Sequence, residues 1–146
     1  MIIDKLNEFC DATSAAINIG NAIIGDVIDL GATPTLRDLG AGEPVYLVIQ
    51  VDTEFAGANG TVQLQLCSDS TANLATSKTV HLDTGAIPVA TLVAGYTKVM
   101  ALPMEATYER YLGLWETVAT TNISAGKINA FLTHDVAKWT AYADGI

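Results

Sequence analysis

Histidine, the residue that most often serves as a catalytic base or metal ligand, occurs twice in the sequence, as His81 and His134. The two lie far apart in the chain, and neither belongs to an H-x-H or H-x-x-x-H pattern. A metal site in a small β-protein needs several clustered ligands. We therefore predict no metal site, and we interpret both histidines as surface residues at strand ends.

Nucleophilic catalysis has equally little support in the sequence. Asp135 follows His134 and serine is common, but a Ser-His-Asp triad is defined by geometry and not by the presence of the residue types. No serine stands in the G-x-S-x-G pattern of a nucleophile elbow. Cys10 and Cys67 lack a neighbouring Lys, Arg or His that would lower a thiol pKa, so we interpret both as reduced thiols. We expect no catalytic residues and no enzymatic activity.

Two further patterns could bind anions or transfer protons, and neither is in a suitable context. Gly40–Glu43 reads G-A-G-E but precedes a predicted strand, so no helix N-terminus is expected there to bind a phosphate. Glu105 and Glu109 are four positions apart but flank a predicted strand connection, where we expect both in solvent. We predict no cofactor.

Aromatic residues offer the one alternative binding chemistry. A platform for stacking sugar rings could be built from Trp115, Trp139, Tyr108, Tyr111 and Tyr142. The interpretation that we favour places Trp115 in the core and uses the others as core or interface residues, because large aromatic side chains dominate both environments. A carbohydrate-binding β-sandwich module remains the alternative function.

Composition and charge narrow the classes of partner. Half of the 146 residues are hydrophobic and 16% are charged, against roughly 25% in ordinary soluble domains, which indicates apolar surface that contacts other chains. The formal net charge is −9, and seven Lys and Arg cannot build the basic surface that nucleic acids or anionic membranes require. No apolar run approaches the roughly 18 residues of a membrane helix, and no secretory signal is recognised.

The elements that must organise the chain are strands. Glu43–Asp52 is apolar at successive positions and rich in β-branched residues, which predicts a strand buried on both faces. One face carries Val45, Leu47, Ile49 and Val51, and the other carries Tyr46, Val48 and Gln50. Asn59-Gly60 follows in a predicted turn over Glu54–Gly60 and is a strong hairpin signal.

Further strands are predicted at intervals set by turn residues: Asp26–Leu30, Thr61–Cys67, Thr79–Asp83, Ile87–Val93, Tyr96–Met104, Arg110–Val118 and Lys127–His134. About eight strands without a long helix predict an all-β fold, a jelly-roll-like two-sheet antiparallel sandwich. Residues 1–25 are weakly patterned and are predicted to form an extended N-terminal arm, with a short helix as the alternative. Residues 26–146 would form the domain, ending in an aromatic C-terminal tail. We expect Lys127–His134 to lie in the sheet opposite Glu43–Asp52.

Several short blocks occur together in one order along nearly the whole chain: M-I-I-D-K-L at Met1–Leu6, V-I-D-L-G at Val27–Gly31, G-E-P-V-Y-L-V-I-Q-V at Gly42–Val51, A-I-P-V-A-T-L-V-A-G-Y at Ala86–Tyr96, Y-E-R-Y-L-G at Tyr108–Gly113, G-K-I-N-A-F-L-T at Gly126–Thr133 and K-W-T-A-Y-A at Lys138–Ala143. In these blocks the sequence resembles the capsid cement (decoration) proteins of short-tailed bacteriophages, of the Bordetella phage type. No single block identifies the family, and the specific feature is that all the blocks occur in the same order along the chain.

The resemblance implies a jelly-roll protein made in the host cytoplasm and located on the outer capsid surface of the virion. Such proteins bind as homodimers at two-fold positions and clamp neighbouring major capsid proteins against internal DNA pressure. Decoration proteins of other phages bind as trimers, which stays a second possibility for the self-association. The family has no catalytic residues to transfer, and its partners are the major capsid protein and a second copy of the chain.

Seven residues form the predicted interface of such an assembly. Four lie in the predicted arm, one lies on the central strand, and two lie in the tail: Ile2, Ile3, Leu6, Phe9, Tyr46, Trp139 and Tyr142. The arm is apolar in patches yet too weakly patterned to fold alone. Tyr46 and Val48 face away from the predicted core, so we expect the arm or a second subunit to cover them.

Overall fold

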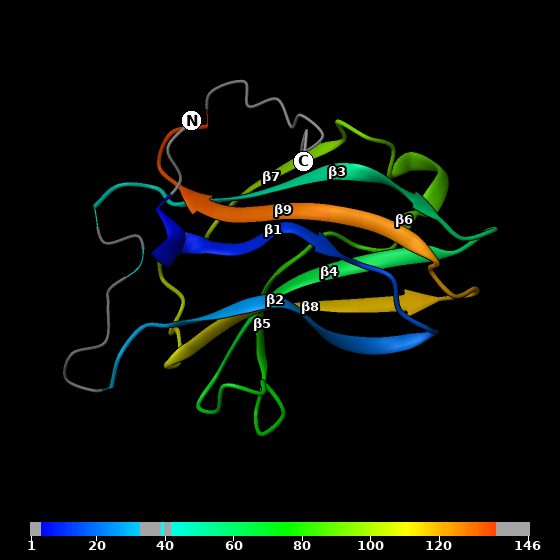
Figure 1. Ribbon diagram of the computed structural model, residues 1–146. Helices are drawn as coiled ribbons and strands as arrows, with labels where there is room; N and C mark the ends of the chain where they lie inside the picture. Colours follow the sequence, from blue (N-terminus) through cyan, green and yellow to red (C-terminus); the bar gives the residue numbers. More distant parts are fainter. Residues whose placement is uncertain (1–3, 33–38, 40–41, 137–146) are drawn as a thin grey trace.

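Two antiparallel β-sheets face one another across the core of this protein, and Figure 1 shows them as an upper and a lower layer. The computed structural model describes residues 4–32, 39 and 42–136. The upper sheet has the strand order β1-β9-β3-β7 and the lower sheet the order β2-β8-β4-β5, with the short β6 pairing with β4. The strand bounds are β1 Glu8–Ser14, β2 Gly20–Asp29, β3 Tyr46–Ala56, β4 Thr61–Asp69, β5 Thr79–Asp83, β6 Ile87–Pro88, β7 Thr97–Ala101, β8 Tyr111–Ala119 and β9 Ala125–Thr133.

This strand order is that of a jelly roll, in which two four-stranded Greek-key motifs are wound together. Successive strands alternate between the sheets at the start of the chain, and β8 and β9 then return to pair beside β2 and β1. The sequence prediction of a two-sheet antiparallel sandwich of the jelly-roll type is confirmed. The described part of the chain has nine strands rather than about eight, because β1 forms in a region where no strand was predicted.

The core lies between the sheets and is filled by alternate residues of the strands. Leu47, Ile49 and Val51 of β3 point inward, and Leu112 and Leu114 of β8 meet them from the other sheet, all at 2% exposure or less. This period-two burial is what strand geometry dictates when one face of each sheet is covered by the other. The strand β4 shows the same alternation, because Val62, Leu64 and Leu66 are all buried.

The central strand β3 is buried on both faces, as its sequence predicts. On its outward face Val48 is 0% exposed and Gln50 is 2% exposed. The strand runs to Ala56, so residues 54–56 belong to it and not to the predicted turn. The following turn, which includes Asn59 at a φ of 54°, does not close a hairpin, because β3 and β4 lie in different sheets. The strand β9 also differs from prediction, since it pairs with β3 within one sheet.

The N-terminal region differs most from the prediction. Residues 8–25 are extended, but they form β1 and the first part of β2 and are integral to both sheets. A short 3₁₀ turn at Lys5–Asn7 precedes them, capped by the Asp4 side chain, which accepts a hydrogen bond from the Leu6 amide at 3.0 Å. The expectation of a separate arm over residues 1–25 is therefore wrong for residues 8–25.

Close backbone packing holds β1 against β2. Gly25 has a φ of +77°, and a Cβ atom at this position would lie 2.0 Å from the carbonyl oxygen of Phe9. Only glycine permits both that conformation and that approach. Gly25, one of the small residues that weaken the helical and strand pattern of this region, thus allows β1 and β2 to pack together.

Candidate interaction surface

The structure places three of the seven predicted interface residues, in three different environments. Leu6 is 66% exposed on the 3₁₀ turn and is available for contact. Phe9 is 1% exposed and belongs to the core, so the prediction that it lies at an interface is wrong. Tyr46 is half-buried at the start of β3. The other four, Ile2, Ile3, Trp139 and Tyr142, lie outside the described residues.

The outward face of the β1-β9-β3-β7 sheet is apolar at its centre. Val48 pairs with Phe131 of β9 and with Val99 of β7, and Phe131 is 1% exposed. The sequence predicted that the arm or a second subunit covers Val48, and because Val48 is fully buried within a single chain, a second subunit is not needed for this. Beside these residues, the Nε2 atom of Gln50 is buried and has no hydrogen-bond partner in the described part of the chain.

In the described part of the chain the sheets end in four edge strands besides the two-residue β6, and these four differ in charge. The strands β1, β2 and β5 each carry acidic residues, namely Glu8, Asp11, Asp26, Asp29 and Asp83. The strand β7 carries none, and its middle residue Val99 is 44% exposed. Acidic or basic side chains on an edge are a common protection against pairing with another chain. On this measure β7, with Lys98, and β5, with Asp83, carry one charged residue each and are less protected than β1 and β2.

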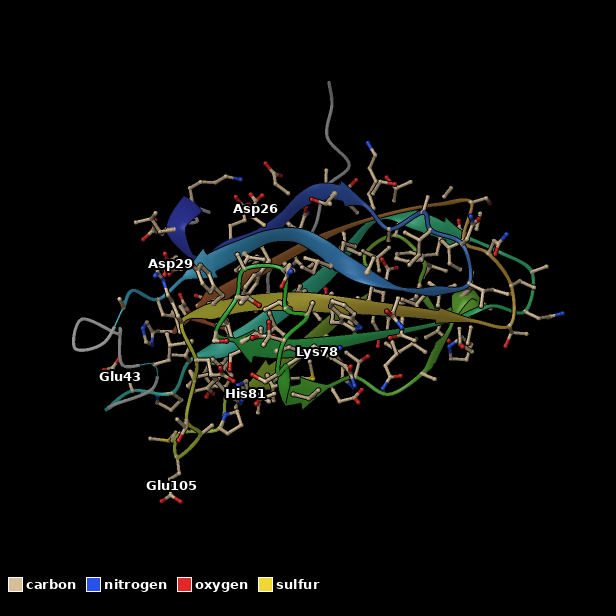
Figure 2. The ribbon with its side chains drawn as sticks, turned by 90° about the horizontal axis from the view of Figure 1, so that it is seen from below. Asp26, Asp29, Glu43, Lys78, His81 and Glu105 are labelled. Carbon is tan, nitrogen blue, oxygen red and sulfur yellow. The ribbon has the colours of Figure 1, made fainter. Side chains whose placement is uncertain are left out.

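A small polar cluster connects β4, β5 and the segment before β8. The Ser68 hydroxyl lies 2.7 Å from Nε2 of His81 and accepts a hydrogen bond from the Glu109 amide at 3.0 Å. The His81 ring lies against Tyr108, with 4.4 Å between ring centroids. Figure 2 shows the molecule from below, with His81 labelled. Ser68 is 0% exposed, so its hydroxyl is closed to substrate, and the arrangement serves to hold three segments together.

The loop after β4 is organised by Asp69. Its carboxylate accepts hydrogen bonds from the amides of Thr71, Thr76 and Ser77 at 2.9–3.2 Å. Burial opposes ionisation of this carboxyl group, but the backbone donors of Ser77, Thr71 and Thr76 outweigh it and lower the pKa of Asp69 below its usual value. The loop therefore returns to β5 along a fixed path.

The carboxyl group of Glu116 lies inside the sandwich. Glu116 is 1% exposed and alternates with Leu114 and Val118 on the inward face of β8. Its Oε1 atom has no hydrogen-bond partner among the described residues. Burial raises the pKa of Glu116 to about 7, because the apolar surroundings disfavour the charged form. The sequence reading did not single out this residue, although a lone Glu at an inward position of an apolar strand was a visible signal.

The groups considered for catalysis and metal binding are dispersed. Burial raises the pKa of Cys10 to about 12 and that of Cys67 to about 11, so both thiols stay protonated near neutral pH. His134 is exposed, and its Nδ1 lies 3.1 Å from the carbonyl oxygen of Pro44. No group of three or more His, Cys, Asp or Glu that could hold a metal ion occurs in residues 4–32, 39 and 42–136. Over the same residues, no helix is long and apolar enough to cross a membrane.

The described aromatic residues of the proposed sugar platform are engaged with their neighbours. Trp115 is not in the core but half-buried on the outer face of β8, where the Lys78 ammonium lies 3.6 Å from the ring centroid. Figure 2 shows Lys78 over this sheet. Tyr108 is 6% exposed, and the Arg110 guanidinium lies 4.9 Å from the Tyr111 ring. Each ring thus has a partner within the chain.

Comparison with known proteins agrees with the phage resemblance at the level of family. No curated protein matches the sequence. The model of the Bbp16 family, whose name indicates a Bordetella phage protein, matches residues 12–132. That range begins within β1 and ends within β9, so it takes in nearly the whole jelly roll. The chain therefore belongs to the Bbp16 family.

Proposed function

We propose that this protein is a capsid cement protein, a homodimer that binds the outer surface of a tailed-phage shell and holds neighbouring major capsid proteins together. The observation that carries the proposal is the family match over residues 12–132, which covers nearly every strand of the fold. The ordered sequence blocks that resemble phage cement proteins extend the same similarity towards both ends of the chain.

The chemistry of the described surface fits a structural role in binding. The chain is acidic, with a net charge of −9, and exposes single large apolar residues such as Leu6 and Val99. Stable protein contacts need roughly 1,200–2,000 Å² of total buried surface, and apolar side chains surrounded by polar groups are typical of their centres. The acidic surface would favour a capsid face with basic groups.

The mechanism follows from mass action. A protein that binds the assembled shell but not dissociated subunits adds its binding free energy to the stability of the shell. The effect at one site is modest, but a shell presents many equivalent sites. A rigid jelly roll suits this role, because ordering costs little when the binding surface is formed before contact.

The experiment that tests the stabilising role is thermal disassembly of shells that lack this protein. We expect the disassembly temperature to rise as purified protein is added and to level off when the sites are filled. An unchanged disassembly temperature at saturating protein would contradict the proposal. A glycan array tests the alternative of a carbohydrate-binding module, which would give binding to defined sugars and no effect on shells.

A further inference from the structure

The strand β7 presents a free backbone edge with a defined direction. At the two ends of the β3–β7 ladder, the Leu102 amide donates to the carbonyl oxygen of Val45 and the Val51 amide donates to that of Tyr96. The register between these points pairs Leu47 with Met100 and Ile49 with Lys98. Hydrogen-bonded residues alternate along an antiparallel strand, so the backbone groups of the intervening residues, Thr97, Val99 and Ala101, point away from β3.

Those three residues are also exposed and uncharged. Thr97, Val99 and Ala101 are all exposed, Val99 at 44%, and within residues 4–32, 39 and 42–136 no strand pairs with this edge of β7. The one charged side chain of the strand is that of Lys98, which lies on the opposite face from Val99. An exposed edge with a β-branched residue at its centre is a template for a further strand.

Charge decides which partner fits this edge. The chain carries 16 acidic and seven basic residues, so contact between two copies brings like charges together almost everywhere. Among the four edge strands, β7 is the one without Asp or Glu. Two copies that meet through β7 would therefore avoid placing carboxylates opposite one another.

We propose that β7 pairs with β7 of a second copy, antiparallel and centred on Val99, so that one continuous sheet crosses the homodimer. The inference rests on the proposed function for the existence of a dimer, and it adds the surface that forms it. With the two-fold axis at Val99, Thr97 faces Ala101 of the other copy, and the outward amides and carbonyls can form about six interchain hydrogen bonds. The two Val99 side chains meet across the axis.

Sedimentation velocity over a range of concentrations tests this pairing with two matched variants. Val99→Asp places a carboxylate at the centre of β7. Val80→Asp is the control, because Val80 is also 44% exposed and lies in β5, an edge strand of the same length in the other sheet. We expect the wild-type chain and Val80→Asp to be dimers and Val99→Asp to be a monomer that keeps the circular dichroism spectrum of the folded wild type.

Each other outcome overturns the proposal. A wild-type chain that stays monomeric at high micromolar concentration, a dimeric Val99→Asp, or a monomeric Val80→Asp would each exclude β7 as the dimer contact. If the wild-type chain is monomeric and Val99→Asp fails to bind shells, the edge serves an extended segment of the capsid protein instead.

Hydrogen exchange on the wild-type protein gives a readout that does not depend on a variant folding. The amides of Thr97, Val99 and Ala101 should exchange slowly at high protein concentration and at least tenfold faster on dilution, whereas the Leu102 amide, bonded to Val45, should not change. Fast exchange at all concentrations would overturn the pairing. Shell binding is measured separately, so loss of the dimer with retained shell binding refutes this contact and not the cement role.

Discussion

The Ser68 hydroxyl and the His81 ring form a 2.7 Å hydrogen bond that connects β4 to β5, and the same hydroxyl accepts a hydrogen bond from the Glu109 amide. A hydroxyl can accept and donate at once, so Ser68 accepts a hydrogen bond from Glu109 and can donate its own proton to the neutral ring. Ser68 is fully buried. One side chain therefore satisfies polar groups from two other segments.

Acid should weaken this connection. Burial lowers the pKa of His81 below its ordinary value of 6.5, so the folded protein favours the neutral ring. The stability that this group contributes is present above pH 6.5 and is lost as the pH falls through the lower folded-state pKa. We expect urea unfolding midpoints to fall as the pH drops below about 6.5, and to fall less in His81→Gln. Equal pH dependence in both proteins would contradict this role.

Removal of the hydroxyl should have a separate cost at every pH. Ser68→Ala leaves the Glu109 amide without its acceptor, and an unsatisfied buried donor costs about 1–3 kcal/mol. We expect the free energy of unfolding to fall by that amount. Ser124→Ala is the control, because its hydroxyl is exposed and donates to the Ala56 carbonyl at 3.2 Å. A loss in Ser124→Ala as large as that in Ser68→Ala would contradict the assignment.

Glu116 should make the protein less stable in mild alkali. Its pKa rises from 4.5 to about 7 on folding, so between these values the folded state binds more protons than the unfolded chain. The free energy of unfolding therefore decreases as the pH rises from about 4.5, and the loss is complete above about pH 7, at about 3 kcal/mol.

The variant Glu116→Gln removes the charge while keeping the shape of the side chain. We expect it to be more stable than the wild type at pH 8, by up to about 3 kcal/mol, and nearly equal at pH 5. Glu54→Gln, at an exposed position, is the control, and its difference in stability from the wild type should be the same at pH 5 and pH 8. Calorimetry across this pH range measures the difference, and parallel curves for wild type and Glu116→Gln would show that burial does not perturb this group.

Gly25 should be among the least replaceable residues. Gly25→Ala combines a φ of +77° with a Cβ position 2.0 Å from the Phe9 carbonyl oxygen and 2.5 Å from the Cys10 sulfur. Gly85→Ala is a matched control, because Gly85 has a φ of +69° and nothing within 4 Å of the added Cβ. We expect a loss of about 1–2 kcal/mol for Gly85→Ala, from backbone strain alone, and of at least about 4 kcal/mol for Gly25→Ala. Similar losses at both positions would mean that β1 and β2 do not pack as closely as described.

Leu6 is the described residue of the predicted interface that remains most available. Leu6→Asp should weaken shell binding by about tenfold or more, because loss of an apolar anchor removes about 1–2 kcal/mol of binding free energy. Ile19→Asp, at a residue that is 57% exposed, is the control for added charge. Binding isotherms on shells give the comparison, and an unchanged affinity in Leu6→Asp would remove Leu6 from the interface.

Much of the fold could be predicted because strand periodicity reports burial directly. The predicted strand Thr79–Asp83 has the observed bounds, and Thr61–Cys67 differs by two residues at its end. Pairing could not be predicted, since the periodicity of Lys127–His134 is the same whichever sheet it joins. The prediction also missed β1, because Asp11 and Ala12 have low strand propensity and lie at an irregularity in the pairing with β9, between Cys10 and Thr13.

The interface was harder to predict than the fold, for a physical reason. The sequence pattern around an apolar residue such as Phe9 is the same whether its side chain packs inside one chain or between two chains. Here Phe9 packs inside the chain. Val99 gave no signal, because its exposure depends on β7 lying at the end of a sheet, which is a property of topology. Glu116 could have been noticed, since charge at an inward strand position is rare.

The cement role is tested most directly by sedimentation of the purified protein with phage shells that lack it. We predict saturable binding, with a fixed number of copies per shell and no binding to unassembled capsid protein. Protein that remains in the supernatant at all concentrations, although the shells themselves sediment intact, would contradict the cement role.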